Sequence, residues 1–348
     1  MSPSEDAGAA DGGDESFDES LEAAGLLHEQ IPAALAGERL DRIVSLVTGA
    51  SRADAAVLVA AGGASVDGAV VLSGKVRLVT GQEVVIDPSH LPQPLAPEPE
   101  PDVVFEVVYA DDDVIVVDKP AGLVVHPGAG NPTGTLVNGL LARFPEIASV
   151  GDPARPGIVH RLDVGTSGLL VVARSPRAYE RLVAALAGRE VGRRYHTLVW
   201  GHPANPQGVI DAPIGRDHRD PMRMAVVVDG KVARTRYRVV RTYRQVAEVA
   251  EVACQLETGR THQIRVHLSA IGHPVVGDGT YGGNRSALVV PRPFLHAAAL
   301  SFVHPGTGEV VSFESPIPED LAAVVASLGD AETDDLPVDL PVDDQPTT

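Results

Sequence analysis

The sequence predicts a large domain of the α+β class over residues 103–328, preceded by a small α/β module over residues 31–88. Helix-like and strand-like segments are mixed along the large segment without the regular βαβ alternation of a parallel α/β fold. A proline-rich stretch, residues 89–102, separates the two segments and is typical of a semi-extended linker. With 348 residues, of which 44% are hydrophobic, the chain is long enough to bury a sizeable core.

The small segment predicts two helices followed by a hairpin. An amphipathic helix face is indicated by the i, i+3, i+4, i+7 spacing of Leu40, Ile43, Val44 and Val47. Ser51 can cap a second helix, which Gly62 can end. Asp67-Gly68 lies between two β-prone runs and predicts a two-residue hairpin turn.

The large segment predicts a strand-rich domain with helical inserts. Residues 133–144 read as a helix with Leu136, Val137, Leu140 and Leu141 on one face. A second helix is predicted to begin after Thr261 as N-cap and to end before Gly272. Cys254 alternates with Val252 and Leu256 in a strand-like run, so we expect a buried core thiol. Residues 299–313 predict a hairpin with a Pro-Gly-containing turn.

Acidic residues are concentrated at the two ends of the chain. Residues 1–25 contain eight acidic residues and no basic one, and residues 329–348 contain seven and none. Removing these carboxylates from the net charge of −19 leaves −4 for the rest of the chain. We expect disordered tails over residues 1–30 and 329–348. Residues 155–194 carry eight arginines against three acidic residues, so the overall charge does not exclude a phosphate-bearing partner.

Several classes of protein are disfavoured by the sequence. No apolar run approaches ~18 residues, and the N-terminus lacks the basic and apolar parts of a secretory signal. We therefore expect a cytoplasmic protein without a membrane span. The single cysteine excludes an internal disulfide and a cysteine-based zinc site. The glycines of residues 126–134 miss the spacing of a nucleotide-binding loop, so nucleotide binding there is not expected. His262 and His267 would point to different faces of a helix, which argues against a metal site.

The segment from Gly157 to Ser175, GIVHRLDVGTSGLLVVARS, carries the chemistry. A polar, glycine-punctuated stretch lies between two apolar runs and contains Asp163 with Arg161 two residues earlier. A carboxylate beside arginines can stay ionised and serve as a nucleophile or base. It can equally form a structural ion pair, and the residues alone do not decide between the two.

Five motifs resemble the RluA-type pseudouridine synthases. HRLDVGTSGLLVVA (160–173) is similar to the catalytic motif of that family, and DVIVVDKPAGLVVHP to its first motif. GRRYHTLVWG (192–201) resembles its Lys-x-Tyr strand, with Arg193 where lysine is usual. LETGRTHQIRVHLSAIGHPVVGDGTYG (256–282) and the closing HAAALSFVHPGTGEV also match, so the resemblance spans about residues 105–322. Within the family the chain is most similar to the ribosomal large-subunit synthase D group.

The small segment is similar to an S4 RNA-binding domain. The resemblance rests on Arg39-Leu40-Asp41 and on Ser51-Arg52, which match the opening RLD and the following SR of that domain. It implies an RNA-binding module in front of the catalytic domain, with Arg39 and Arg52 as RNA-binding residues.

The resemblance implies a mixed, largely antiparallel sheet of pseudouridine synthase type and a monomeric enzyme that needs no cofactor and no metal. Its substrate would be a uridine in structured RNA, with large-subunit ribosomal RNA as the expected target. Asp163 would open the glycosidic bond, Tyr195 would pack on the uracil and take the proton from C5, and Arg265 would hold Asp163 ionised. The remaining implied uridine- and RNA-binding residues are His160, Arg161, Thr166, Ile264 and Leu268.

Two other functions stay open at this point. A noncatalytic RNA-binding or ribosome-assembly protein could keep the same fold. A metal-dependent or glycosidase-like hydrolase could use Asp163 to release free uracil.

Overall fold

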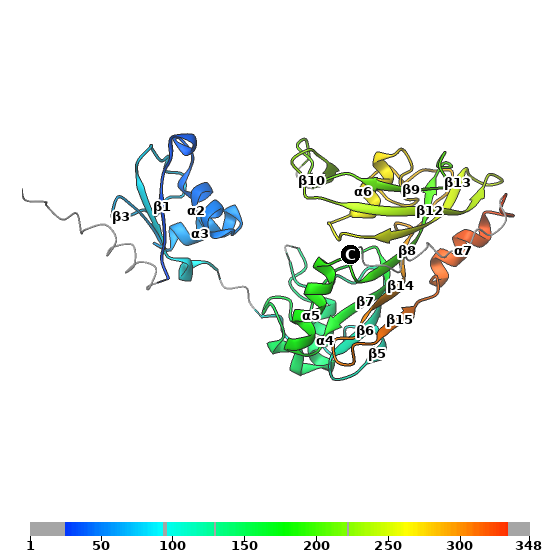
Figure 1. Ribbon diagram of the computed structural model, residues 1–348. Coiled ribbons are helices and arrows are strands. Elements are labelled where there is room, and N and C mark those ends of the chain that lie inside the picture. The colour runs from blue at the N-terminus through cyan, green and yellow to red at the C-terminus, as the bar shows by residue number, and fades with distance from the viewer. Residues whose placement is uncertain (1–24, 93–95, 129, 221–222, 333–348) are drawn as a thin grey trace, which may run out of the picture. The chain divides into compact units, whose positions relative to one another are not determined.

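The computed structural model describes residues 25–92, 96–128, 130–220 and 223–332. The chain divides into two compact units, Met1–Pro94 and Leu95–Thr348 (Figure 1). Most of the two predicted acidic tails lies outside the described residues; residues 27–30, at the end of the first predicted tail, form a strand. In the described part, no single helix is long and apolar enough to cross a membrane. The helices Leu40–Thr48 and Arg52–Ala60 reach that length and composition only when taken together, and the pair is bent by 113°.

The small unit contains the two predicted helices, α2 (Leu40–Thr48) and α3 (Arg52–Ala60). The predicted apolar face of α2 is confirmed, because Leu40, Ile43 and Val44 are fully buried. Ser51 is the N-cap of α3, and its hydroxyl accepts a hydrogen bond of 3.1 Å from the backbone N–H of Asp54.

A four-stranded sheet accompanies these helices, with strand order β1-β4-β2-β3. Asp67 and Gly68 connect β2 to β3 and both have positive φ, 49° and 76°, as a type I′ hairpin turn requires. The predicted hairpin is therefore confirmed. The strands are β1 (Leu27–Gln30), β2 (Ala64–Val66), β3 (Ala69–Val70) and β4 (Glu83–Ile86).

The large unit is built on one mixed, largely antiparallel sheet of nine strands. Eight strands run in the order β5-β6-β7-β14-β8-β13-β12-β9, and β15 pairs with β14. The pairing of β14 with β7 is parallel, whereas the other pairings in this sheet are antiparallel. The strands are β5 (Glu106–Ala110), β6 (Val114–Lys119), β7 (Ser167–Ala173), β8 (Gly192–Trp200), β9 (Gln207–Asp211), β12 (Arg234–Tyr243), β13 (Val249–Leu256), β14 (Leu295–Val303) and β15 (Val310–Glu314), beside a separate ribbon of β10 (Ile214–Arg216) and β11 (Met224–Val226).

Helices cover both faces of this sheet. Alternate residues of β6 and β7 bury against α4 on one face and against α5 on the other, since their side chains alternate along each strand. Figure 1 shows α4 and α5 at the β5–β7 end of the sheet and α6 beside its β12 end. The helices are α4 (Leu136–Arg143), α5 (Pro176–Ala187), α6 (Gln263–Ala270) and α7 (Glu319–Ser327), with a 3-10 turn at Pro145–Ser149. The small unit has 3-10 turns at Ala33–Leu35 and Pro88–His90.

The start of α6 differs from the prediction. Thr261 is not the N-cap; that position belongs to His262, whose backbone is left-handed with φ 58°. Gln263 explains the shift, because its side-chain oxygen accepts the backbone N–H of Arg260 at 2.9 Å and closes the turn before the helix. Ile271 ends the helix and Gly272 follows with φ 88°, as predicted.

Gly168 is the point of closest approach between β7 and β14. Its φ is 111°, and a Cβ at this position would lie 2.3 Å from the carbonyl oxygen of Ala297. Substitution by alanine would therefore force both backbone strain and a clash with main chain. We expect Gly168→Ala to lower the free energy of unfolding by about 2–5 kcal/mol. Urea titration beside Gly128→Ala, where a Cβ meets nothing within 4 Å, measures this; equal stability of the two variants would contradict it.

Candidate active site

Asp163 lies in the loop that leads into β7, at the edge of a cavity of about 420 Å³ in the large unit. Two contacts hold this loop in place. The backbone N–H of Thr166 donates to the carbonyl oxygen of Asp163 at 3.0 Å. The backbone N–H of Val171 in β7 donates to Nε2 of His160 at 3.1 Å. The carboxylate is thus carried on a turn that is closed by an internal hydrogen bond and tied to β7 through His160.

Arg265 joins Asp163 to a second, fully buried carboxylate. Its Nη1 donates to Oδ2 of Asp163 at 3.1 Å. Its Nε and Nη2 donate to the two oxygens of Asp278 at 2.6 and 3.0 Å, a bidentate pair. Burial acts to lower the pKa of Arg265, but the hydrogen bonds and charges of Asp278 and Asp163 raise it above its ordinary value. The guanidinium therefore stays charged and is aimed at Asp163.

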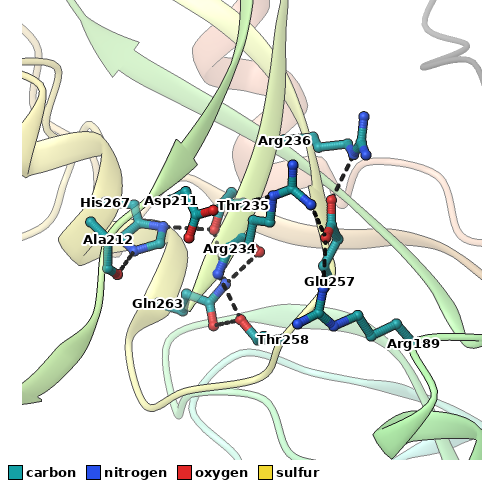
Figure 2. A network of polar contacts seen from close by, with 10 residues as sticks. All are labelled: Arg189, Asp211, Ala212, Arg234, Thr235, Arg236, Glu257, Thr258, Gln263 and His267. Atoms are coloured by element: carbon teal, nitrogen blue, oxygen red, sulfur yellow. Dashed lines mark hydrogen bonds and ion pairs between the residues drawn. The ribbon is translucent and has the colours of Figure 1, made fainter. Parts of the chain in front are cut away.

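Polar side chains anchor the helix that carries Arg265 (Figure 2). The amide of Gln263 donates to the carbonyl oxygen of Arg234 at 3.0 Å and to the Thr235 hydroxyl at 2.9 Å. His267, one turn later, has one ring nitrogen 2.9 Å from the same hydroxyl and the other 2.9 Å from the carbonyl oxygen of Ala212. These contacts fix α6 to β12 and so fix the direction of Arg265.

The turn before α6 is held by a carboxylate shared among three arginines. Glu257, at the end of β13, accepts from Arg234 at 3.0 Å, from Arg236 at 2.7 Å and from Arg189 at 3.3 Å (Figure 2). The hydroxyl of the next residue, Thr258, donates to Gln263 at 2.7 Å. These contacts therefore stabilise the loop between β13 and α6 where it borders the cavity.

Tyr195 lines the same cavity from β8. Burial raises the pKa of its phenol to about 12, with a further increase from the charge of Asp163 and a partial decrease from Arg193. Leu256, Ile264 and Leu295 add apolar surface to the cavity wall. A flat, mostly apolar ligand fits such a wall.

The cavity is strongly basic at its polar positions. Among the described residues that line it, Asp163 is the only carboxylate. Arg155 and Arg161 are solvent-exposed at its edge, whereas Arg193 is buried. A site with one carboxylate among several cations suits a substrate that brings phosphate groups. The basic lining residues are His126, Arg155, His160, Arg161, Arg193, Arg260 and His262.

Comparison with known proteins identifies the family. Residues 113–270 match the family model described as RNA pseudouridylate synthase. A ribosomal large subunit pseudouridine synthase D of Zymomonas mobilis is 42% identical over 82% of this chain and 92% of its own length. The chain belongs to the RNA pseudouridine synthase family. It is thus an isomerase that acts on RNA.

Two further comparisons agree. An uncharacterized RNA pseudouridine synthase of Bacillus subtilis is 48% identical over 67% of this chain and 77% of its own length. Among solved structures, human RNA pseudouridylate synthase domain containing 1 is 29% identical, with a TM-score of 0.50, and covers 69% of this chain and 99% of that one. The sheet described above is therefore the catalytic fold of a pseudouridine synthase.

Most of the residues that the sequence indicated for this synthase meet at the cavity. Leu268 does not: it lies one helical turn after Ile264 on α6, is fully buried in the main core and is absent from the cavity lining. Arg265 reaches the cavity through its contact with Asp163. The predicted residues that line the cavity are His160, Arg161, Asp163, Thr166, Tyr195 and Ile264.

Arg39 and Arg52 belong to the small unit of the synthase. Both form ion pairs with the buried Asp41, and Arg52 reaches it at 3.2 Å. These two arginines are thus held by a carboxylate of their own unit.

Two residues of the synthase site, Asp278 and Tyr281, were not singled out by sequence. Asp278 forms an ion pair with Arg265. The ring of Tyr281 lies under the Arg265 guanidinium at 5.0 Å, and its hydroxyl is 2.8 Å from Nδ1 of His262. Asp278 and Tyr281 lie in the quoted motif VVGDGTYG, yet nothing in that string marks either as a partner of a helix residue.

Proposed function

We propose that this synthase converts specific uridines to pseudouridine in large-subunit ribosomal RNA, with Asp163 as the catalytic carboxylate. The position of Asp163 carries the proposal, because it is the only carboxylate among the described cavity-lining residues and is held by Arg265. The printed names of relatives, such as the synthase D of Zymomonas mobilis, support the ribosomal target. We also propose that the enzyme works in the cytoplasm as a monomer, without metal or cofactor.

The reaction exchanges one bond of ribose for another. Asp163, held by Arg265, acts on the ribose while the bond between C1′ and N1 breaks. The uracil turns in the cavity against Tyr195 and rejoins C1′ through C5. The C5 proton leaves and N1 gains a proton, so atoms and charge balance without an oxidant or reductant. The apolar wall at Leu256, Ile264 and Leu295 accommodates the base during this turn.

The uridine must leave the RNA stack before this chemistry can begin. Extrusion of a nucleotide costs a few kcal/mol. The exposed Arg155 and Arg161 at the edge of the cavity can contact the flanking phosphates and offset that cost. We propose the small unit, with Arg39 and Arg52, as an additional RNA-binding module.

Tritium release from 5-tritiated uridine in unmodified ribosomal RNA transcripts tests the function. Release in the presence of EDTA, without free uracil, is the expected result. Loss of release with EDTA, or formation of free uracil, would favour a hydrolase. Tight binding of the transcripts without release would favour a noncatalytic assembly protein.

The pH dependence tests the proposed role of Tyr195 as proton acceptor. With a pKa of about 12, the phenol is protonated at neutral pH and must ionise before it can take the C5 proton. Its ionised fraction grows about tenfold per pH unit below the pKa. We therefore expect single-turnover tritium release to rise about tenfold per unit between about pH 6 and 9. Tyr195→Phe should abolish that rise, whereas a flat wild-type profile would assign the proton to another group.

A further inference from the structure

Arg193 is a buried cation without a partner in the described part of the protein. It lies in β8, lines the cavity, and is only 6% exposed. No hydrogen bond or ion pair joins its guanidinium to another described residue, and its Nε is buried without an acceptor. Arg265, at similar depth, has two carboxylates. Because an unpaired buried charge is costly, the arrangement points to an oxygen atom that arrives with the ligand.

His160 presents a second unsatisfied donor to the same cavity. Its Nε2 accepts the backbone N–H of Val171, so that nitrogen carries no proton. Burial, assisted by the charge of Arg193, lowers the pKa of His160 to about 3, and the ring is neutral at physiological pH. The remaining proton therefore sits on Nδ1, which is buried without a hydrogen-bond partner in the described structure. The Nε–H of Arg193 and the Nδ1–H of His160 are thus two buried donors without an acceptor in the described structure.

The position of Arg193 indicates that its partner is the base of the nucleotide rather than a phosphate. Arg193 and Tyr195 are two residues apart on β8, so their side chains point to the same face about 7 Å apart. The pKa of Tyr195 responds to Arg193 and to Asp163, which places both charged groups near the phenol. A ribose at Asp163 with its uracil against Tyr195 therefore directs the edge of the base toward Arg193. The flanking phosphates stay with the RNA chain, near exposed Arg161.

We propose that Arg193, together with the Nδ1–H of His160, binds a carbonyl oxygen of the flipped uracil and stabilises the negative charge that forms on the base. This inference rests on the proposed function. When the bond between C1′ and N1 breaks, its electron pair remains with the uracil and spreads over N1 and the two carbonyl oxygens. The charge disappears when C5 bonds to C1′. A guanidinium fixed beside that oxygen favours the charged state over the neutral base, which accelerates bond cleavage.

Arg193→Met and Arg193→Lys test this role in single-turnover tritium release and in RNA binding at several salt concentrations. For Arg193→Met we expect a rate about 10²–10³-fold lower, because one donor at a developing anion is lost. The Kd and its salt dependence should change little. Arg193→Lys, which keeps the charge, should recover part of the rate. The melting temperature of Arg193→Met should not fall, because methionine removes an unpaired buried charge.

Three outcomes would overturn the inference. A Kd that rises as much as the rate falls, with a weaker salt dependence, would assign Arg193 to a phosphate. An unchanged rate would remove it from the chemistry. A lower melting temperature with a proportionate loss of activity would make its role structural. A wild type that releases no tritium contradicts the proposed function itself and is thus a separate result.

A second variant displaces the same guanidinium without removing it. A Cβ on Gly259 would lie 2.9 Å from Nη1 of Arg193, and Gly259 has no positive φ that would strain an alanine. We expect Gly259→Ala to lower the rate with an unchanged Kd, though less than Arg193→Met does. Arg238→Met is the matched control for Arg193→Met. It makes the same substitution on β12, at a position that alternates with the buried Tyr237. A rate for Gly259→Ala equal to that of the control would contradict the placement of Arg193 at the base.

Discussion

Replacing Asp163 with asparagine is expected to lower tritium release from ribosomal RNA by at least about 10⁴-fold, the scale seen when a central catalytic group is removed. The substitution keeps the size of the side chain and its ability to accept a hydrogen bond from Arg265 at Nη1. It removes the charge with which the carboxylate acts on ribose. Binding of the RNA should change by less than about threefold, because the substitution leaves unchanged Arg155 and Arg161, the exposed arginines that we propose contact the phosphates.

The measurement compares wild type and Asp163→Asn in single-turnover tritium release and in filter binding of the same transcript. Loss of release with retained binding places Asp163 in the chemistry. Release at the wild-type rate would exclude it as the catalytic carboxylate. Since Asp163 is the only carboxylate among the described residues of the cavity wall, such a result would also remove the basis of the proposed reaction.

Local signals in the sequence predicted many of the elements. The Asp67-Gly68 turn, the Ser51 cap and the apolar face of Leu40, Ile43 and Val44 each depend on a few neighbouring residues. The order of the strands did not follow from such signals. The parallel pairing of β14 with β7 joins residues about 130 positions apart, and it is made possible by the close backbone approach at Gly168. Pairings at that separation leave no mark in a short window of sequence.

The functional site was likewise predictable only where its residues are close together in the sequence. Asp163, Arg161 and His160 share one loop, so their proximity could be read from the chain. The start of α6 was misplaced by one residue, because the turn is closed by the side chain of Gln263 rather than by a cap. Arg193 was noted only as a departure from the usual lysine; its lack of a partner became visible once the surrounding residues were placed.

Asp278 is the residue whose removal we expect to affect both stability and catalysis. It is fully buried, and besides Arg265 it accepts the backbone N–H groups of Thr280 at 2.9 Å and Tyr281 at 3.2 Å. Asp278→Asn would leave a buried guanidinium with Asp163 as its one remaining carboxylate partner among the described residues. Breaking a buried pair from one side costs about 3–5 kcal/mol, and we expect the free energy of unfolding to fall by that amount.

The catalytic effect of Asp278→Asn follows from the loss of the bidentate contact that directs Arg265. A displacement of about 1 Å in a positioning group can cost 10²-fold in rate, so we expect a loss of that order in kcat with little change in RNA affinity. Asp320→Asn is the matched control for stability, since Asp320 forms a bidentate pair with Arg292 but its side chain is 42% exposed. That variant should lose no more than about 1 kcal/mol. Equal losses of stability in the two variants, or full activity of folded Asp278→Asn, would show that Arg265 needs no support from behind to hold Asp163.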